Sequence, residues 1–251
     1  MHRFFLPPEQ CRDDFLELAG SEAHHALHVL RLHPGAEAVV LDGNGLRLLC
    51  SVHSITRSSL TLSVTHRTHL PEPAWRITLL QAIPKGQLME SIIEKAVELG
   101  AWRIVPLLTE RTVVRLTPEG SLGKQMKWQA TALGAIKQSG SAWLPNIEKP
   151  ITPNEFLARR ETFDLALVGS LRDDATHPRT FFREFSDRHN RRPATVALWI
   201  GPEGDFSFAE LELIQASGAL PITLGPLVLR SDTAATCALA VLNYELSSGS
   251  C

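Results

Sequence analysis

The sequence predicts an α/β fold, with a parallel sheet that carries helices on both faces and a small β-rich domain before it. From Trp75 onward, short and continuously apolar segments alternate with amphipathic ones, which is typical of a parallel sheet covered by helices. Before that point, apolar residues recur with period two around a glycine-rich turn, as in half-buried strands. The prolines of Leu70-Pro71-Glu72-Pro73 disfavour both helix and central strand. We therefore expect one domain over residues 1–70 and another over residues 74–251.

The first domain is expected to combine strands with one helix. The helix is predicted over residues 21–31, with Ser21 as its N-cap. A hairpin turn is predicted at Asp42-Gly43-Asn44-Gly45, because Asp-Gly and Asn-Gly pairs favour tight turns. The predicted strands cover residues 38–41, 46–52 and 60–64.

The second domain is expected to alternate strands with helices. The predicted strands cover residues 77–82, 104–108, 165–168, 195–200 and 220–224. The predicted helices cover residues 87–99, 124–138 and 176–185, with one more after each of the last two strands. The first of these helices has an apolar face and is followed by Gly100 at the C′ position.

The composition is that of a soluble globular protein. Of the 251 residues, 44% are hydrophobic and 21% are charged, with no membrane-length apolar run and no signal peptide pattern. Cysteines are scattered without a CxxC pair, which favours a reduced, cytoplasmic setting. They are Cys11, Cys50, Cys237 and Cys251. The net charge of −2 does not by itself indicate a nucleic-acid binder.

Three predicted strands of the second domain end in glycine, at Gly169, Gly201 and Gly225. Ligands bind at the carboxyl ends of the strands in an open parallel sheet, where helix N-termini also offer free N–H groups. Ser207 and Glu210 form a predicted capping box, and Ser231 or Asp232 is expected to cap the last helix in the same way. Each glycine alone fits a tight turn without a ligand, whereas three at one edge predict a small-molecule site.

Several familiar ligand classes lack their motifs. The chain contains no G-x-G-x-x-G, no Walker lysine, no H-E-x-x-H and no G-x-S-x-G. Dinucleotide, nucleotide-triphosphate, zinc-protease and α/β-hydrolase sites are therefore not expected.

Two segments near these strand ends carry a family resemblance. Residues 200–207 read Ile-Gly-Pro-Glu-Gly-Asp-Phe-Ser, and residues 224–234 read Leu-Gly-Pro-Leu-Val-Leu-Arg-Ser-Asp-Thr-Ala. With shorter matches along nearly the whole chain, they resemble the RsmE family, the uridine-N3 methyltransferases of small-subunit ribosomal RNA in the SPOUT superfamily. The chain departs from the family pattern at four positions. Asp205 stands where the pattern has its second loop glycine, and Asp232 stands where it has glutamate. Leu227 and Ser141 stand at positions where family members carry arginine.

The resemblance implies a PUA-like β-barrel at the N-terminus and a SPOUT domain tied in a trefoil knot, usually as a homodimer. It implies S-adenosylmethionine as cofactor, with its adenine on backbone groups around Leu224, Gly225 and Leu229 and with residues 201–204 as the facing wall. The residues expected to bind the cofactor are Gly169, Ile200, Gly201, Pro202, Gly204, Leu224, Gly225, Leu229 and Thr233.

Methylation at N3 of uridine requires loss of the imide proton and stabilisation of the charge that spreads to the ring oxygens. We expect Arg230 to stabilise this charge, with a phosphate contact as the alternative. Glu203 is expected to hold the turn or to take the proton, and Asp232 is a weaker base candidate.

The expected partner is small-subunit ribosomal RNA in an assembled or late-assembly 30S particle. RNA contacts are expected from Arg3, His24, His28, Arg31, Lys85 and Arg111. His24 and His28 have no third ligand at suitable spacing, so no metal is expected. Two alternatives stay open, namely methylation of a ribose 2′-hydroxyl and a non-catalytic RNA-binding protein with the same fold.

Overall fold

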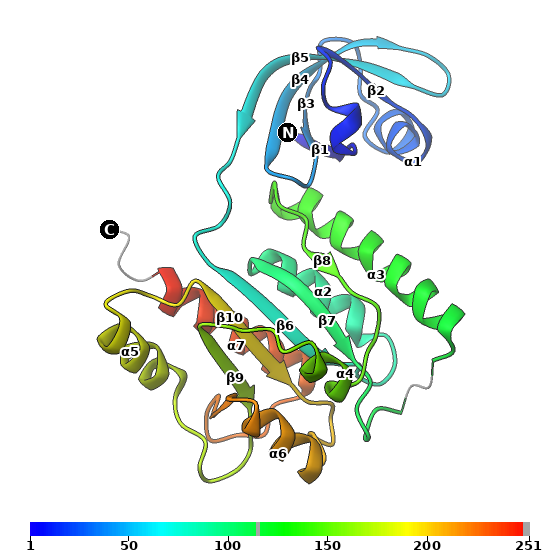
Figure 1. Ribbon diagram of the computed structural model, residues 1–251. Coiled ribbons are helices and arrows are strands. Elements are labelled where there is room, and N and C mark those ends of the chain that lie inside the picture. The colour runs from blue at the N-terminus through cyan, green and yellow to red at the C-terminus, as the bar shows by residue number, and fades with distance from the viewer. Residues whose placement is uncertain (114–115, 248–251) are drawn as a thin grey trace. The chain divides into compact units, whose positions relative to one another are not determined.

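The computed structural model describes residues 1–113 and 116–247, and the chain divides into two compact units (Figure 1). The first unit comprises residues 1–72 and 133–144, and the second comprises residues 73–132 and 145–251. Cys251 lies outside the described residues.

The first unit is built on a curled five-stranded sheet with the order β1-β3-β4-β5-β2. Its strands are β1 (His2–Phe5), β2 (Phe15–Leu18), β3 (Glu37–Leu41), β4 (Leu46–Ile55) and β5 (Leu60–His69). β1 runs parallel to β3, and the other pairs are antiparallel. Two register shifts interrupt the long β4–β5 ladder and bend it around an apolar core that includes Phe4, Leu16 and Leu48.

The strands predicted for this unit are confirmed, and β4 and β5 extend beyond their expected ends. The hairpin turn is confirmed as well. Asp42 Oδ1 accepts the backbone N–H of Asn44 at 2.7 Å and that of Leu46 at 2.9 Å, which fixes the turn.

The prediction that Ser21 caps a helix was wrong. The helix α1 (Gly20–His24) begins before Ser21, and Ala19 occupies the cap position without a side-chain hydrogen bond. Gly20 makes the turn into the helix with a φ of +58°. A π-helical turn, η2 (His25–Val29), follows, and the helix ends short of Arg31, whose φ of +52° does not continue a right-handed helix. A 3₁₀ turn, η1 (Pro8–Gln10), completes the unit.

The second unit contains the predicted parallel sheet, with the order β11-β9-β10-β6-β7-β8 and every pair parallel. Its strands are β6 (Arg76–Ala82), β7 (Ala101–Leu107), β8 (Asn146–Ile147), β9 (Leu165–Gly169), β10 (Thr195–Ile200) and β11 (Leu220–Ile222). β11 is shorter than expected, because the hydroxyl of Thr223 accepts the N–H of Gly225 at 3.3 Å and the chain turns there. The short β8 was not predicted.

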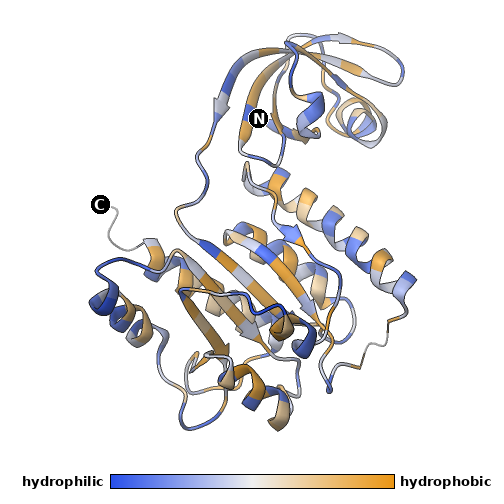
Figure 2. Ribbon diagram, in the orientation of Figure 1, coloured by the Kyte–Doolittle hydropathy of each residue, from blue (hydrophilic) through white to orange (hydrophobic). Residues whose placement is uncertain are grey.

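Helices cover both faces of this sheet, as predicted. They are α2 (Leu88–Glu98), α3 (Pro118–Ser139), α4 (Pro153–Ala158), α5 (Pro178–His189), α6 (Phe208–Ala216) and α7 (Ser231–Ser247). On one face α2 packs against α7 and β7, and α7 also contacts β10. On the other, α4 and α6 pack together over a core that contains Leu80, Trp199 and Leu211. The central strands are apolar along most of their length (Figure 2), since both of their faces are buried.

Helix boundaries differ from the predicted ones where side chains provide a cap. The predicted helix over residues 176–185 begins later, at Pro178, because His177 Nδ1 accepts the N–H of Arg179 at 3.3 Å and Thr176 pairs with Ile222. α2 lies within its predicted range, and Gly100 after it has the predicted left-handed φ, +74°. Among the described residues, no helix is long and apolar enough to cross a membrane.

Candidate functional site

A cleft lies at the carboxyl ends of β9, β10 and β11, where the sequence predicts a ligand. It contains about 610 Å³ of empty space, its open mouth included. Three groups of residues line it, one from each strand end. They are Gly169, Ser170 and Leu171; Ile200, Gly201, Pro202, Glu203 and Asp205; and Ile222, Thr223, Leu224, Gly225, Leu227, Val228, Leu229, Ser231 and Ala234.

The loop after β10 is a tight turn that leads directly into α6. Ser207 caps the helix by accepting the N–H of Glu210 at 3.3 Å, and Glu210 accepts the N–H of Ser207 at 2.9 Å in return. The predicted capping box is therefore confirmed. Gly201 must lack a side chain, because a Cβ there would lie 2.9 Å from Asp205 Oδ1 and 3.1 Å from the backbone nitrogen of Phe206. The turn is thus fixed at its start by the close contact of Gly201 with Asp205 and Phe206, and at its end by the Ser207 cap.

A buried hydrogen-bond chain ties the floor of the cleft together. Gln81 Nε2, on β6, donates to Ser231 Oγ at 2.9 Å, and Ser231 Oγ donates to the carbonyl oxygen of Gly201 at 2.7 Å. Ser231 therefore does not cap α7, which was one of the two predicted caps, but links the start of α7 to the end of β10. Asp232 does not supply a visible cap either, since its buried Oδ1 has no hydrogen-bond partner within the described residues.

Two further contacts fix the rim of the turn. Glu203 Oε1 accepts the backbone N–H of Lys85 at 3.0 Å. The guanidinium group of Arg111 donates to the carbonyl oxygen of Gly204. Both contacts join the segments after β6 and β7 to the loop after β10, so that neighbouring strand ends are held together.

The cleft is apolar apart from a few polar groups, and its charged lining residues are both acidic. Glu203 and Asp205 are the ionisable side chains among the described residues that line it. Burial raises the pKa of the Asp205 carboxyl above its ordinary value, while the N–H of Phe206 and the charge of Arg111 act in the opposite direction. An apolar cleft with two carboxylates is suited to a ligand that carries a positive charge together with apolar or aromatic parts.

The structure brings most of the predicted cofactor residues to this cleft. All of them line it except Gly204 and Thr233. Gly204 is exposed on the outer side of the turn, where its carbonyl meets Arg111, and Thr233 is exposed on the first turn of α7. Of the two predicted catalytic residues, Glu203 lines the cleft and Arg230 does not. Arg230 is exposed and follows the lining residue Leu229, and no described residue forms a hydrogen bond with its guanidinium group.

Gln81, Ser170 and Thr223 contribute to this site although no sequence pattern predicted them. Ser170 and Thr223 directly follow strand residues, and their hydroxyls bond to nearby backbone, to Arg172 N at 3.2 Å and to Gly225 at 3.3 Å. The only available signal was their place near a strand end, since Ser170 follows the predicted strand 165–168 and Thr223 lies near the end of the predicted strand 220–224. Gln81 gave none, because a glutamine within an apolar strand does not reveal a partner 150 positions away.

The residues expected to contact RNA in the first unit have different surroundings. The guanidinium group of Arg3 donates to the carbonyl oxygens of Lys137 at 3.1 Å and Gln138 at 2.8 Å, so it has a structural role. His24 and His28 lie side by side, with ring centroids 4.7 Å apart. In the part of the chain that the structure describes, no group of three or more histidine, cysteine or acidic side chains could hold a metal ion.

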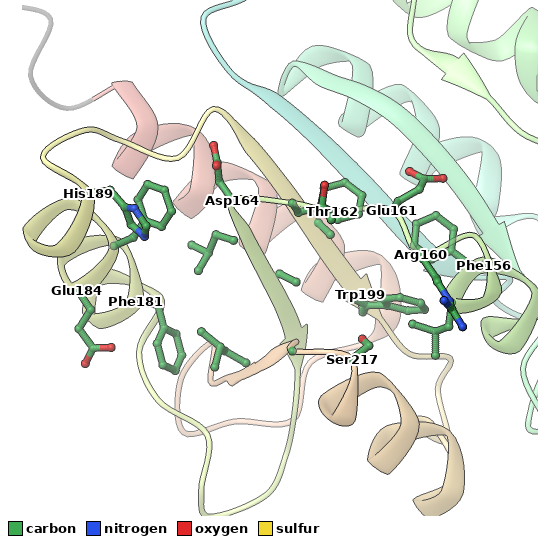
Figure 3. Close-up of a pocket in the computed structure, with 18 of the residues that line it drawn as sticks. Phe156, Arg160, Glu161, Thr162, Asp164, Phe181, Glu184, His189, Trp199 and Ser217 are labelled. Carbon is green, nitrogen blue, oxygen red and sulfur yellow. The ribbon is translucent and has the colours of Figure 1, made fainter.

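A second and larger cavity lies elsewhere in the second unit, with about 1410 Å³ of empty space on the same measure. Figure 3 shows Phe181, Glu184 and His189 of α5 on one side of it, and Phe156 and Trp199 on the other. It lies against the first residues of β9 rather than at the strand ends that carry the two motifs. Its size alone does not indicate a ligand, so we place the candidate site in the smaller cleft.

Comparison with known proteins identifies the family. The profile of an RNA methyltransferase domain matches residues 71–243, and that of an RNA methyltransferase PUA domain matches residues 18–65. A relative from Synechocystis, named ribosomal RNA small subunit methyltransferase E, is 34% identical over 252 residues, which cover 98% of this chain and 78% of the relative. This chain belongs to the RsmE family. It is an RNA methyltransferase, and the resemblance seen in its two motifs is confirmed.

Other relatives of this RsmE-family chain match over its full length. The Bacillus subtilis protein of the same name is 27% identical and covers 98% of this chain. A methyltransferase from Legionella pneumophila, solved with the bound cofactor SAM, is 32% identical with a TM-score of 0.84, and 96% of each chain is covered. A ribosomal RNA small subunit methyltransferase E from Neisseria gonorrhoeae, solved bound to S-adenosyl methionine, is 26% identical with a TM-score of 0.82 and the same coverage.

Proposed function

We propose that this chain transfers a methyl group from S-adenosylmethionine to N3 of a specific uridine in small-subunit ribosomal RNA. The observation that carries the proposal is the acidic, apolar cleft formed by the two family motifs at the carboxyl ends of β9, β10 and β11. Relatives that match nearly the whole chain are named as ribosomal RNA methyltransferases, and two similar structures contain SAM.

The residues of the cleft fit S-adenosylmethionine, which when bound supplies an electrophilic methyl group on a positively charged sulfur. Apolar side chains such as Ile200, Leu224 and Leu229 suit the adenine ring, and backbone groups at the strand ends suit its nitrogen atoms. A Cβ on Gly225 would meet no protein atom within 4 Å, so this strand end leaves room for a ligand. Glu203 and Asp205 give the cleft the negative charge that a cationic ligand requires.

Arg230 is the residue we propose to stabilise the uracil anion as its N3 proton is lost. Its guanidinium group has no hydrogen-bond partner among the described residues, so it is available to the O2 or O4 oxygen of the base. Glu203 already accepts the N–H of Lys85. We therefore assign Glu203 to positioning of the loop, with Thr233 and Gly204 in supporting positions around the cofactor.

RNA recognition is assigned to residues 1–70 and methyl transfer to residues 74–251, with the chain threaded as a trefoil knot around the cofactor. The PUA profile over residues 18–65 and the methyltransferase profile over residues 71–243 support this division. His24, His28, Arg31, Lys85 and Arg111 would contact the RNA, whereas Arg3 would support them through its bonds to backbone carbonyls.

The natural substrate would be the RNA within a 30S particle at a late stage of assembly, and the enzyme would act in the cytoplasm as a homodimer. Ribosomal RNA of bacteria is located there, and the names of the relatives support an RNA of this class. Light scattering of the purified protein, alone and with SAM, tests the oligomeric state.

Mass spectrometry of ribosomal RNA nucleosides tests the reaction. We expect N3-methyluridine to appear in small-subunit RNA when this protein is expressed in a bacterial strain that lacks the modification. A 2′-O-methylated nucleoside in its place would refute the assignment to N3. Calorimetry that detects no binding of S-adenosylmethionine would refute methyl transfer altogether and favour an RNA-binding protein without catalysis.

A further inference from the structure

A glutamine lies buried in the apolar sheet, one hydrogen bond away from the lining of the cleft. Gln81, on β6, is fully buried, and Ser231, the first residue of α7, has 4% of its surface exposed. In the parallel register Gln81 lies beside Ile200 of β10 and Pro106 of β7, and neither neighbour is charged. Burying an amide at such a place is costly unless the amide forms hydrogen bonds. The bonds that Gln81 makes therefore indicate its role.

The hydrogen bonds of Gln81 have a fixed direction. Its Nε2 donates to the carbonyl oxygen of Ala82 at 2.8 Å and to Ser231 Oγ at 2.9 Å. A carbonyl oxygen can only accept, so the amide nitrogen and not the amide oxygen must lie on this side. Oε1 is buried and has no hydrogen-bond partner among the described residues. Within the described structure, Gln81 therefore acts as a donor alone.

This direction is passed on by Ser231 to Gly201. The serine hydroxyl has one proton, and its oxygen already accepts from Gln81. The proton is therefore donated to the carbonyl oxygen of Gly201, which lies 2.7 Å from Oγ. The amide of Gln81 thus determines which way the serine hydroxyl points.

The carbonyl oxygen of Gly201 is the one group through which its peptide bond can be held by a hydrogen bond. The next residue is Pro202, which has no backbone N–H, and the peptide unit is planar. Both Gly201 and Pro202 line the cleft. The bond to Ser231 therefore sets the orientation of a peptide unit that faces the ligand.

We propose that Gln81 is a positioning residue for S-adenosylmethionine and acts through Ser231 on the Gly201–Pro202 peptide bond. The inference rests on the proposed function of the cleft. The amide keeps the serine proton on the Gly201 oxygen, so that this wall of the cleft has one conformation before the cofactor binds. Gln81 does not itself line the cleft, so its effect on the cofactor is transmitted by Ser231.

Reversing the donor distinguishes this role from simple packing. Gln81→Glu keeps nearly the same shape, but an ionised carboxylate only accepts hydrogen bonds. Ser231 would then donate to the carboxylate, because bonds to charged acceptors are stronger, and the Gly201 oxygen would lose its donor. When protonated, the introduced carboxyl has an O–H that can donate to Ser231 and restore the original direction.

The protonation of the introduced carboxyl depends on its surroundings. Burial raises the pKa of a carboxyl group, which favours the protonated form at mildly acidic pH. The charged side chains of the neighbouring segments have both signs, so they oppose one another. They are Lys85 after β6, Arg111 after β7, Glu203 and Asp205 after β10, and Arg230 and Asp232 on either side of Ser231.

The test is calorimetry of S-adenosylmethionine binding to the full chain, with wild type measured at each pH. At about pH 9, we expect the dissociation constant to rise about tenfold or more in Gln81→Glu and in Ser231→Ala. Gln81→Met should cause a rise of about threefold, because its serine can still donate to Gly201. The loss in Gln81→Glu should shrink towards about pH 6, whereas the other two losses stay constant.

Two results would overturn the positioning role. One is a loss of affinity in Gln81→Glu that does not depend on pH, or no loss at about pH 9. The other is wild-type affinity in Ser231→Ala, which breaks the same link without introducing a buried charge and so decides the question even if Gln81→Glu fails to fold.

Asn243→Ala is the matched control. Asn243 also lies on α7, outside the cleft lining, and its Nδ2 donates to the carbonyl oxygen of Leu99 at 2.8 Å. The variant loses a similar bond, but its affinity for S-adenosylmethionine should stay within about twofold of wild type. A loss as large as in Ser231→Ala would show that lower stability alone weakens binding, against the proposal. Wild-type protein that fails to bind S-adenosylmethionine would refute the proposed function itself, whereas equal binding by all variants refutes only the positioning role.

Discussion

Single residues decide how the cleft interacts with its ligands, and Arg230 illustrates this. It lies between Leu229 and Ser231, which both line the cleft, yet its own side chain is exposed and without a hydrogen-bond partner in the described structure. An exposed and unpaired guanidinium group next to the cleft can contact a substrate that arrives from solvent. It does not contact a cofactor bound inside the cleft.

We predict that Arg230→Ala lowers the rate of methyl transfer by about 100-fold, because stabilisation of charge in the transition state is lost. The affinity for S-adenosylmethionine should stay the same, since Arg230 does not line the cleft. Single-turnover kinetics and calorimetry measure the two effects. Arg160→Ala, at another exposed arginine of the same unit, is the control and should retain wild-type turnover. Unchanged turnover in Arg230→Ala would remove this residue from the catalytic mechanism.

The described cysteines differ in their environments. Burial raises the pKa of the Cys11 thiol and of the Cys50 thiol to about 11 in each case. At pH 8 both thiols are therefore almost entirely protonated, and only the thiolate reacts with alkylating agents. We expect iodoacetamide to modify the partly exposed Cys237 before Cys11 and Cys50, which should react only after unfolding. Peptide mass spectrometry reads each site, and early modification of Cys11 would contradict its burial.

At the level of elements, caps place the functional loops. Ser207 begins α6 directly after the turn of the cleft, and Thr152 begins α4 with the same capping box outside the cleft lining. These two residues form a matched pair, since the same hydrogen bonds are made in two places with different neighbours.

We predict that Ser207→Ala and Thr152→Ala each lower the free energy of unfolding by about 1 kcal/mol, the usual effect of losing an N-cap. Only Ser207→Ala should also weaken the binding of S-adenosylmethionine, by several-fold, because it loosens the turn that includes Gly201 and Asp205. Urea unfolding and calorimetry provide the measurements. Equal affinities in the two variants would show that the cap does not shape the cleft.

At the level of the whole molecule, one ion pair links stability to pH. Asp164 precedes β9 and binds Arg191 through two oxygens at 2.7 and 2.9 Å, and it also accepts the N–H of Ala194 at 2.7 Å. The pKa of Asp164 is lowered from 3.8 to about 2, chiefly by the hydrogen bond from Arg191 and also by those from Ala194 and Thr195. Because the folded pKa is depressed, this stabilisation is complete above about pH 4 and is lost as the pH falls towards 2.

We predict that Asp164→Asn lowers the free energy of unfolding at pH 7 by about 1–2 kcal/mol, allowing for the exposure of Arg191. The difference between variant and wild type should shrink as the pH falls from 4 towards 2. Urea unfolding over this range measures it, with Asp187→Asn as a control that changes little. A difference that is independent of pH would refute the role of the ion pair.

The sequence determined the fold class, the order of most strands and helices, the position of the cleft and the family. These follow from local signals: apolar periodicity, prolines, caps, and two motifs whose residues are close together in the chain. The strands β6, β9 and β10 were predicted to within one residue at each end because they are apolar on both faces, whereas β7 begins three residues before its predicted start. The first helix was predicted less well. Its start at Gly20 and the π-helical turn after it depend on backbone conformations that residue types do not specify.

Which residues share an environment depends on tertiary packing. The link from Gln81 through Ser231 to Gly201 joins three distant segments, so the serine that the sequence suggested as a cap has a different role. The structure also separated Arg230 and Thr233 from the lining and placed Asp205 within it, although all three belong to the same motifs. A motif gives the residues and their spacing, but the direction of each side chain depends on how the loops pack. For that reason the cleft could be located from the sequence, whereas the side chains that line it could be recognised only from the fold.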